Sequence, residues 1–205
     1  MLDNKGFDLW ADDYDKSVGL SDDDNSYPFA GYKEVLNQIY NEVLYLPAKK
    51  ILDVGFGTGT LTSRLYEKGI EIYGQDFSEE MLKIAQEKMP DAHLYSKDFS
   101  DGLSEEILAN KYDAIIATYS LHHLEDEHKV DFIKSLIPLL DDGGKILIGD
   151  VAFRTRHDLE ICKNHAGDYW DNEEFYFVYD EIKDKFPTTT FDQISYCAGI
   201  ITVKG

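Results

Sequence analysis

The chain has 205 residues, of which 43% are hydrophobic and 13% aromatic, which is enough apolar material for one substantial core but leaves little room for two domains. Because 40 acidic residues face 20 basic ones, the formal net charge is −20, which argues against nucleic acid and anionic membranes as partners. Cys162 and Cys197 form neither a C-x-x-C nor a zinc-type pattern and are typical of reduced thiols.

The N-terminal region differs in character from the rest of the chain. It has no basic start followed by an apolar run, and no later stretch reaches the ~18 apolar residues of a membrane helix, so we expect a cytoplasmic protein. Residues 1–46 are rich in Asp and aromatic residues, and apolar positions at helical spacing predict a helix over residues 29–46. We expect residues 1–46 to form a helical cap over the functional site of a core that spans residues 47–205 in a single domain.

From residue 50 onward, short apolar runs alternate with amphipathic stretches. The predicted strands cover residues 51–54, 70–73, 112–117 and 145–148, and the predicted helices cover residues 61–68, 79–88 and 130–140. This alternation indicates a doubly wound α/β fold, a mostly parallel sheet with helices on both faces. Residues 188–196 and 200–204 predict two further strands, and the short link between them indicates a C-terminal antiparallel hairpin.

A glycine-dense turn, DVGFGTG over residues 53–59, follows the first predicted strand. Glycine permits positive φ angles and lets a ligand lie against the backbone, while the amides that open the next helix favour an anionic group. After Gly55 and Gly57, the dinucleotide fingerprint G-x-G-x-x-G needs its third glycine at position 60, where this chain has Thr60. The G-x-G-x-G spacing, ending at Gly59, therefore predicts a different nucleotide site.

Acidic residues also end the next two predicted strands. Asp76 follows the strand at residues 70–73, where a carboxylate can accept hydrogen bonds from both ribose hydroxyls. Phe77 beside it could pack on an adenine face. Asp98 ends a shorter strand, where it could accept from an adenine amine, although aspartates at such positions are also common without a ligand.

In order, the segments DVGFGTGTL, YGQDFSEEML, KDF, YDAIIATYSLHHLED and LLDDGGKILIGD resemble the motifs of class I S-adenosylmethionine-dependent methyltransferases over about residues 50–150. WADDYD, at residues 10–15, is similar to the start of small bacterial members, including the uncharacterised YrrT-like type. The resemblance implies a Rossmann-like fold with a seven-stranded sheet. It also implies S-adenosylmethionine as cofactor, and methyl transfer to a small-molecule acceptor, neutral or cationic, with S-adenosylhomocysteine as product.

The same resemblance implies roles for individual residues. Asp53 would reach the cofactor ammonium, the glycines of the turn would line its methionine part, and Asp76 would hold the ribose. Asp98 and the Phe99 amide would read the adenine, and Tyr14 would close over the methionine carboxylate. The residues expected to bind the cofactor are Tyr14, Asp53, Gly55, Gly57, Gly59, Asp76, Phe77, Asp98, Phe99 and Thr118.

The end of the fourth predicted strand bears on the reaction. It reads TYSL from Thr118 instead of the N/D-P-P-Y/F motif, which disfavours methylation of amino groups in nucleic acids or of glutamine. An acceptor that must lose a proton needs a general base, and His122, His123 and Asp150 are candidates. A histidine pair at this point could equally begin a helix or pack beneath the cap.

Other ligands and activities stay open. His157 and His165 are too far apart for a paired ligand site on one helix, and we expect no metal. A non-catalytic protein that binds S-adenosylmethionine is one alternative, because a fold and a cofactor pocket do not establish turnover. An NAD-dependent oxidoreductase is another, although the sequence offers no matching catalytic arrangement.

Overall fold

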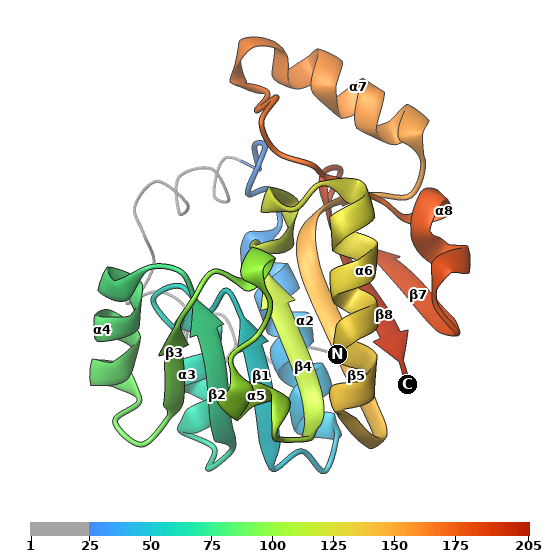
Figure 1. Ribbon diagram of the computed structural model, residues 1–205. Helices are drawn as coiled ribbons and strands as arrows, with labels where there is room; N and C mark the ends of the chain where they lie inside the picture. Colours follow the sequence, from blue (N-terminus) through green and yellow to red (C-terminus); the bar gives the residue numbers. More distant parts are fainter. Residues whose placement is uncertain (1–24) are drawn as a thin grey trace.

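The structure, a computed structural model, describes residues 25–205 (Figure 1). Its sheet has the strand order β3-β2-β1-β4-β5-β8-β7, with the short β6 paired to β5. The strands are β1 (Lys50–Val54), β2 (Glu71–Asp76), β3 (His93–Ser96), β4 (Tyr112–Thr118), β5 (Leu140–Phe153), β6 (Phe177–Val178), β7 (Thr188–Gln193) and β8 (Ala198–Lys204). β1 to β5 run parallel, as the βαβ alternation predicts.

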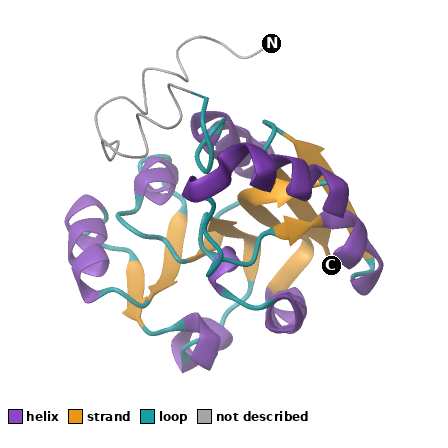
Figure 2. Ribbon diagram, turned by 90° about the horizontal axis from the view of Figure 1, so that it is seen from above, coloured by secondary structure: helices purple, strands orange, loops and turns teal. Residues whose placement is uncertain are grey.

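Helices lie on both faces of this sheet, which confirms the doubly wound fold (Figures 1 and 2). The helices are α2 (Tyr32–Tyr45), α3 (Thr60–Tyr66), α4 (Glu79–Lys88), α5 (Glu105–Leu108), α6 (Asp126–Leu136), α7 (Arg156–Ala166) and α8 (Tyr179–Ile182). Successive strand residues face opposite layers: Ile51 packs with α2 and α3, whereas Leu52 packs with the cluster that includes α6. Within residues 25–205, no helix is long and apolar enough to cross a membrane.

The predicted C-terminal hairpin is confirmed, with a shift in its turn. β8 runs antiparallel to both β5 and β7. The turn lies at residues 194–197 because the Ile194 and Ser195 amides both donate to the Ala198 carbonyl, at 2.9 and 3.1 Å, so that β8 begins at Ala198. Cys197 in this turn and Cys162 on α7 are buried free cysteines.

The amphipathic helix expected within the cap is present as α2, and it packs on the face of the sheet. Val35 and Ile39 on α2 are fully buried. A Cβ added at Gly149 of β5 would lie 2.4 Å from Val35 Cγ1 and 2.7 Å from Ile39 Cδ1, so glycine permits this close approach. α2 is therefore part of the core. A cap made by residues 1–24 lies outside the described residues and stays a prediction.

The packing of α2 against β5 can be tested at Gly149. Gly149→Ala adds a methyl group where two α2 side chains leave no space, and overpacking of this kind lowers the free energy of unfolding by about 1–3 kcal/mol. Urea denaturation followed by circular dichroism measures the loss. Thr188→Ala, at an exposed position of β7, is the control and should change stability by less than about 0.5 kcal/mol. Equal stability of Gly149→Ala and wild type would contradict the described packing.

Candidate functional site

The glycine turn joins the end of β1 to the start of α3. Gly55, Gly57 and Gly59 have φ values of +74°, +53° and +74°, a region that L side chains rarely adopt. A Cβ at Gly55 would lie 2.4 Å from Ser120 Cβ, and one at Gly59 would lie 2.9 Å from Met89 Cε. At Gly57, no heavy atom of the described chain lies within 4 Å of the added Cβ. The backbone at Gly57 is therefore open to a ligand.

Ser120 holds the turn from the neighbouring strand. It follows β4, is buried, and donates a hydrogen bond from Oγ to the Val54 carbonyl at 2.8 Å. Sequence reasoning missed this residue. A serine after a strand carries no signal of its own, and its role depends on β4 lying beside β1.

Asp53 lies beneath the turn as a buried acid with an incomplete set of partners. Its side chain is 1% exposed, and Oδ2 accepts a hydrogen bond from the Thr62 hydroxyl on α3. Among residues 25–205, no group donates to Oδ1. Burial raises the pKa of Asp53 to about 7 against the lowering effect of Thr62, and the nearby Asp76 charge adds to the rise. The site therefore presents a carboxylate oxygen that lacks a donor.

Asp76 ties the turn to the end of β2. Its Oδ2 accepts from the Gly57 amide at 2.8 Å, and its Oδ1 accepts from the Ser78 amide at 2.9 Å. Each carboxylate oxygen has a second lone pair, so both can still accept from a ligand. The neighbouring Phe77 ring is 65% exposed. Asp76 thus fixes the turn and leaves acceptor capacity beside an exposed aromatic face.

The other expected cofactor residues end the adjacent strands. Asp98, after β3, accepts from the Ser100 amide at 2.8 Å and is exposed. Phe99 is buried near Gly55, and Thr118, which ends β4, is partly buried. Because the carboxyl ends of parallel strands meet at one edge, these residues share that edge with the glycine turn. Tyr14 lies outside the described residues.

A second polar cluster lies beyond β4 and β5. His122 and Asp150 are 7% and 1% exposed, and His122 Nδ1 lies 2.6 Å from Asp150 Oδ1. Since a carboxylate only accepts, Nδ1 carries the proton. The Val151 amide also donates to Asp150 Oδ1, at 2.8 Å. The structure therefore brings His122 and Asp150 into contact, with the His123 ring beside them, and Asp150 orients the His122 ring.

Glu174 completes this cluster, and sequence reasoning missed it. Its Oε1 lies 3.5 Å from His122 Nε2, and its Oε2 accepts from the Tyr176 hydroxyl at 2.6 Å. The Phe175 amide donates to the His122 carbonyl at 2.8 Å, and buried Lys129 donates to the Phe175 carbonyl. Glu174 lies in a loop, 52 residues after His122 in sequence, so no local spacing links the two.

Electrostatics set the charge state of the cluster. Burial alone would lower the pKa of His122, but the Asp150 and Glu174 carboxylates outweigh it and raise that pKa above its ordinary value. For His123, burial together with the neighbouring His122 lowers the pKa. His122 is therefore the stronger base of the pair.

The three ligand atoms of His122, His123 and Glu174 lie within 4.8 Å of one another, a spacing compatible with a cation. Within the described chain, the ion pair between His122 and Glu174 and the bond to Asp150 already account for this geometry, and we assign no metal to it. His157 and His165 are exposed on α7.

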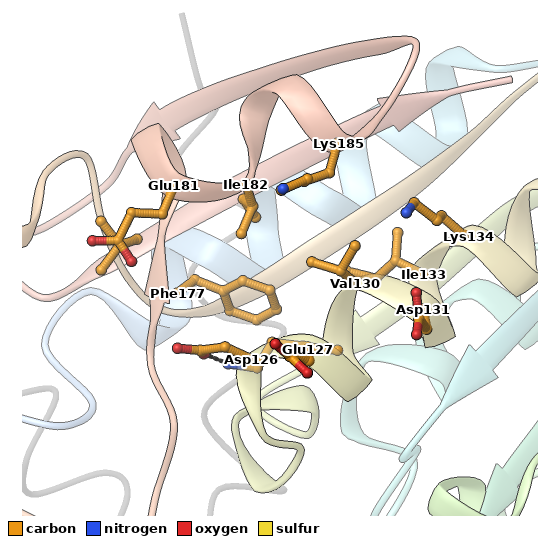
Figure 3. Close-up of a pocket in the computed structure, with 12 residues that line it drawn as sticks. Asp126, Glu127, Val130, Asp131, Ile133, Lys134, Phe177, Glu181, Ile182 and Lys185 are labelled. Carbon is orange, nitrogen blue, oxygen red and sulfur yellow. Dashed lines mark hydrogen bonds and ion pairs between the residues drawn. The ribbon is translucent and has the colours of Figure 1, made fainter.

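A separate cavity of about 370 Å³ lies between α6 and α8 (Figure 3). Phe177, Val130 and Ile182 line it, with charged side chains around them. It contains none of the residues expected to bind cofactor or to act as a base. We therefore place the candidate site at the carboxyl edge of β1 to β5 and not in this cavity.

Comparisons with known proteins bear on the family of the chain. Residues 51–144 match the family described as a methyltransferase domain. An uncharacterized methyltransferase of Geobacillus sp. (strain WCH70) is 34% identical over 183 residues, which cover 89% of this chain and 81% of that protein. Another, from Bacillus mycoides (strain KBAB4), is 38% identical over 151 residues, which cover 72% of this chain and 66% of that protein.

Solved structures show the same fold at lower identity. Magnesium protoporphyrin IX methyltransferase from Synechocystis PCC 6803, with bound S-adenosylhomocysteine, superposes with a TM-score of 0.69 at 21% identity, covering 98% of this chain and 95% of that one. An S-adenosylmethionine-dependent methyltransferase from Clostridium acetobutylicum superposes with a TM-score of 0.68 at 16% identity, covering 92% and 97%. Both likenesses extend well beyond the first strands of the sheet.

Replacement of Asp53 tests its burial. Its pKa is about 7 in the folded chain against 3.8 in the reference state, so the folded protein retains a proton that the unfolded chain loses. Stability is therefore lost as pH rises from about 4 to about 7. In Asp53→Asn this loss is absent, and the variant should gain about 2–4 kcal/mol over wild type between about pH 4 and pH 8.

Urea denaturation at several pH values measures that difference. Asp141→Asn, an exposed aspartate on β5, controls for removal of one negative charge. If the difference in free energy of unfolding between Asp53→Asn and wild type does not grow with pH, this would contradict the described burial of Asp53.

Proposed function

The chain belongs to the class I S-adenosylmethionine-dependent methyltransferases, and from this premise we propose that it transfers the methyl group to a small-molecule acceptor by in-line displacement. The observation that carries the proposal is the pairing of an open glycine turn with a buried acid, Asp53, one oxygen of which has no donor within residues 25–205. We further propose that residues 1–205 form one methyltransferase domain, in which Tyr14 and the rest of residues 1–24 cover the cofactor.

The described residues fit the parts of this cofactor. Asp53 Oδ1 offers an acceptor to the ammonium group, directly or through water, and the open backbone at Gly57 leaves room for the methionine part. Asp76 retains lone pairs for the ribose hydroxyls, and the exposed Phe77 ring offers a face to the adenine. Asp98, the Phe99 amide and the backbone of Thr118 complete the proposed set. When bound, the cofactor supplies an electrophilic methyl group on a sulfonium sulfur.

The chain's own contribution is alignment and proton acceptance. Holding the acceptor in line with the methyl group can supply roughly 7–11 kcal/mol of the barrier reduction. Because Asp150 fixes the proton on His122 Nδ1, the Nε2 lone pair is directed away from Asp150 and can take a proton. We therefore assign His122 as the base and Asp150 as its positioning residue, and give His123 no direct role.

Asp76 provides a binding test of the cofactor site. Asp76→Ala removes an ionic acceptor worth roughly 1.5–3 kcal/mol, so the affinity for S-adenosylhomocysteine should fall by about tenfold or more. Isothermal calorimetry on the purified chain measures it, with circular dichroism to verify folding. Glu79→Gln, an exposed acid nearby on α4, should leave the affinity within about twofold. An unchanged affinity in the alanine variant would remove Asp76 from the site.

The charge state of His122 can be measured without a methyl-acceptor substrate. Its ring faces Asp150 on β5, Glu174 in the loop, Lys129 on α6 and the adjacent His123. Since Glu174 raises the pKa of His122, Glu174→Gln should lower that pKa. An NMR titration of the histidine ring protons measures it, with His122→Asn to assign the resonance.

Glu173→Gln is the matched control because Glu173 is the exposed neighbour of Glu174. Its effect on the His122 titration should be small. A His122 resonance that titrates identically in wild type and in Glu174→Gln would contradict the ion pair between His122 and Glu174.

A further inference from the structure

Two hydrogen-bond acceptor atoms face each other at one side of the His122 ring. His122 Nε2 and Glu174 Oε1 are 3.5 Å apart. In the basic form of His122, both atoms carry lone pairs and neither has a proton to share. Because hydrogen bonds are about 2.8–3.0 Å long, one nitrogen atom of a ligand can donate to both of these atoms at once. The Glu174 side chain is 24% exposed, so solvent reaches its side of the pair.

The number of hydrogen-bond donors on the group that receives the methyl decides which class of substrate fits this pair of atoms. A hydroxyl or a thiol has one proton and can satisfy His122 Nε2 or Glu174 Oε1, but not both. The other atom would then face a lone pair of the bound oxygen or sulfur. A primary or secondary ammonium group has two or three N–H donors and satisfies both atoms at once.

The charged groups around His122 also favour an ammonium group. Asp150 and Glu174 contribute two carboxylates, and among residues 25–205 no donor reaches Asp150 Oδ2. The nearby cation, Lys129, already donates to Asp126 and to the Phe175 carbonyl. The chain as a whole carries a formal charge of −20. A cationic acceptor is therefore attracted to this edge, whereas a carboxylate or phosphate is repelled.

Building on the proposed methyl transfer, we propose that the acceptor is a primary or secondary amine, bound as its ammonium ion by Glu174 and deprotonated by His122. One N–H bonds to Glu174 Oε1, and a second points at His122 Nε2. The proton passes to Nε2, which leaves an imidazolium between Asp150 and Glu174. The freed nitrogen lone pair forms the new N–C bond as the C–S bond breaks and its electron pair stays on sulfur. The product leaves as the methylated ammonium ion, and the His122 imidazolium then releases its proton to solvent.

The test uses pairs of compounds that differ only in the reacting group: benzylamine with benzyl alcohol, butylamine with butanol, and ethanolamine with ethylene glycol. Each is incubated with the full chain and S-adenosylmethionine, and mass spectrometry locates the added methyl group. Methylation at nitrogen is expected. Glu174→Gln should raise KM for the amine by about tenfold, and Glu173→Gln should leave KM within about twofold.

A second readout does not depend on turnover. In wild type, with S-adenosylhomocysteine present, benzylamine should shift the His122 ring resonances, and benzyl alcohol should not. Glu174→Gln should abolish most of the shift. Methylation at oxygen overturns the assignment, as does an absence of both amine product and amine-dependent shift in protein that binds S-adenosylhomocysteine. Folded protein that fails to bind S-adenosylhomocysteine overturns the proposed function instead.

Discussion

The buried Asp53 carboxylate is the constraint on which the site depends. It lies under the glycine turn with one oxygen bonded to Thr62, while the other lacks a donor among the described residues. Isolating a charge in this way costs folding free energy, and burial correspondingly raises the pKa of Asp53 to about 7. A ligand that brings an ammonium group offsets this cost. In the proposed function, the stability that the free protein gives up is recovered as binding free energy.

The sheet explains how the remaining groups reach Asp53. Parallel strands end at one edge, so the residues that follow β1, β2, β4 and β5 meet there although they are far apart in sequence. Asp76 anchors the turn through the Gly57 amide, and Ser120 holds it through the Val54 carbonyl. A few hydrogen bonds between neighbouring strands therefore fix the shape that the cofactor would meet.

In the proposed function, the second cluster binds the methyl acceptor. Asp150 fixes the proton on one His122 nitrogen, and Glu174 faces the other. The two carboxylates keep the ring basic and make its surroundings anionic, which suits a cationic acceptor. The sheet edge thus carries two groups of acidic residues, and we propose that Asp53 serves the cofactor and that the Asp150 and Glu174 pair serves the methyl acceptor.

Sequence patterns were sufficient where the signal is local. The βα alternation, the glycine turn and the acid after β2 depend on spacing of a few residues, and the fold was predicted on that basis. Glu174 and Ser120 were missed because their roles depend on distant residues that the fold brings together. The amphipathic pattern of α2 predicted a helix, but its seat on β5 depends on Gly149, more than 100 residues later.

The most direct measurement is a calorimetric titration of the full chain with S-adenosylhomocysteine at about pH 6.5. Repeating it in buffers of different ionisation enthalpy measures both binding and proton release. Asp53, with a pKa of about 7 in the free protein, should ionise as the ligand ammonium arrives. We expect saturable heat with release of part of a proton per site, and no such release in Asp53→Asn. Folded wild-type protein that gives no binding heat, or that binds without releasing protons, would contradict the account.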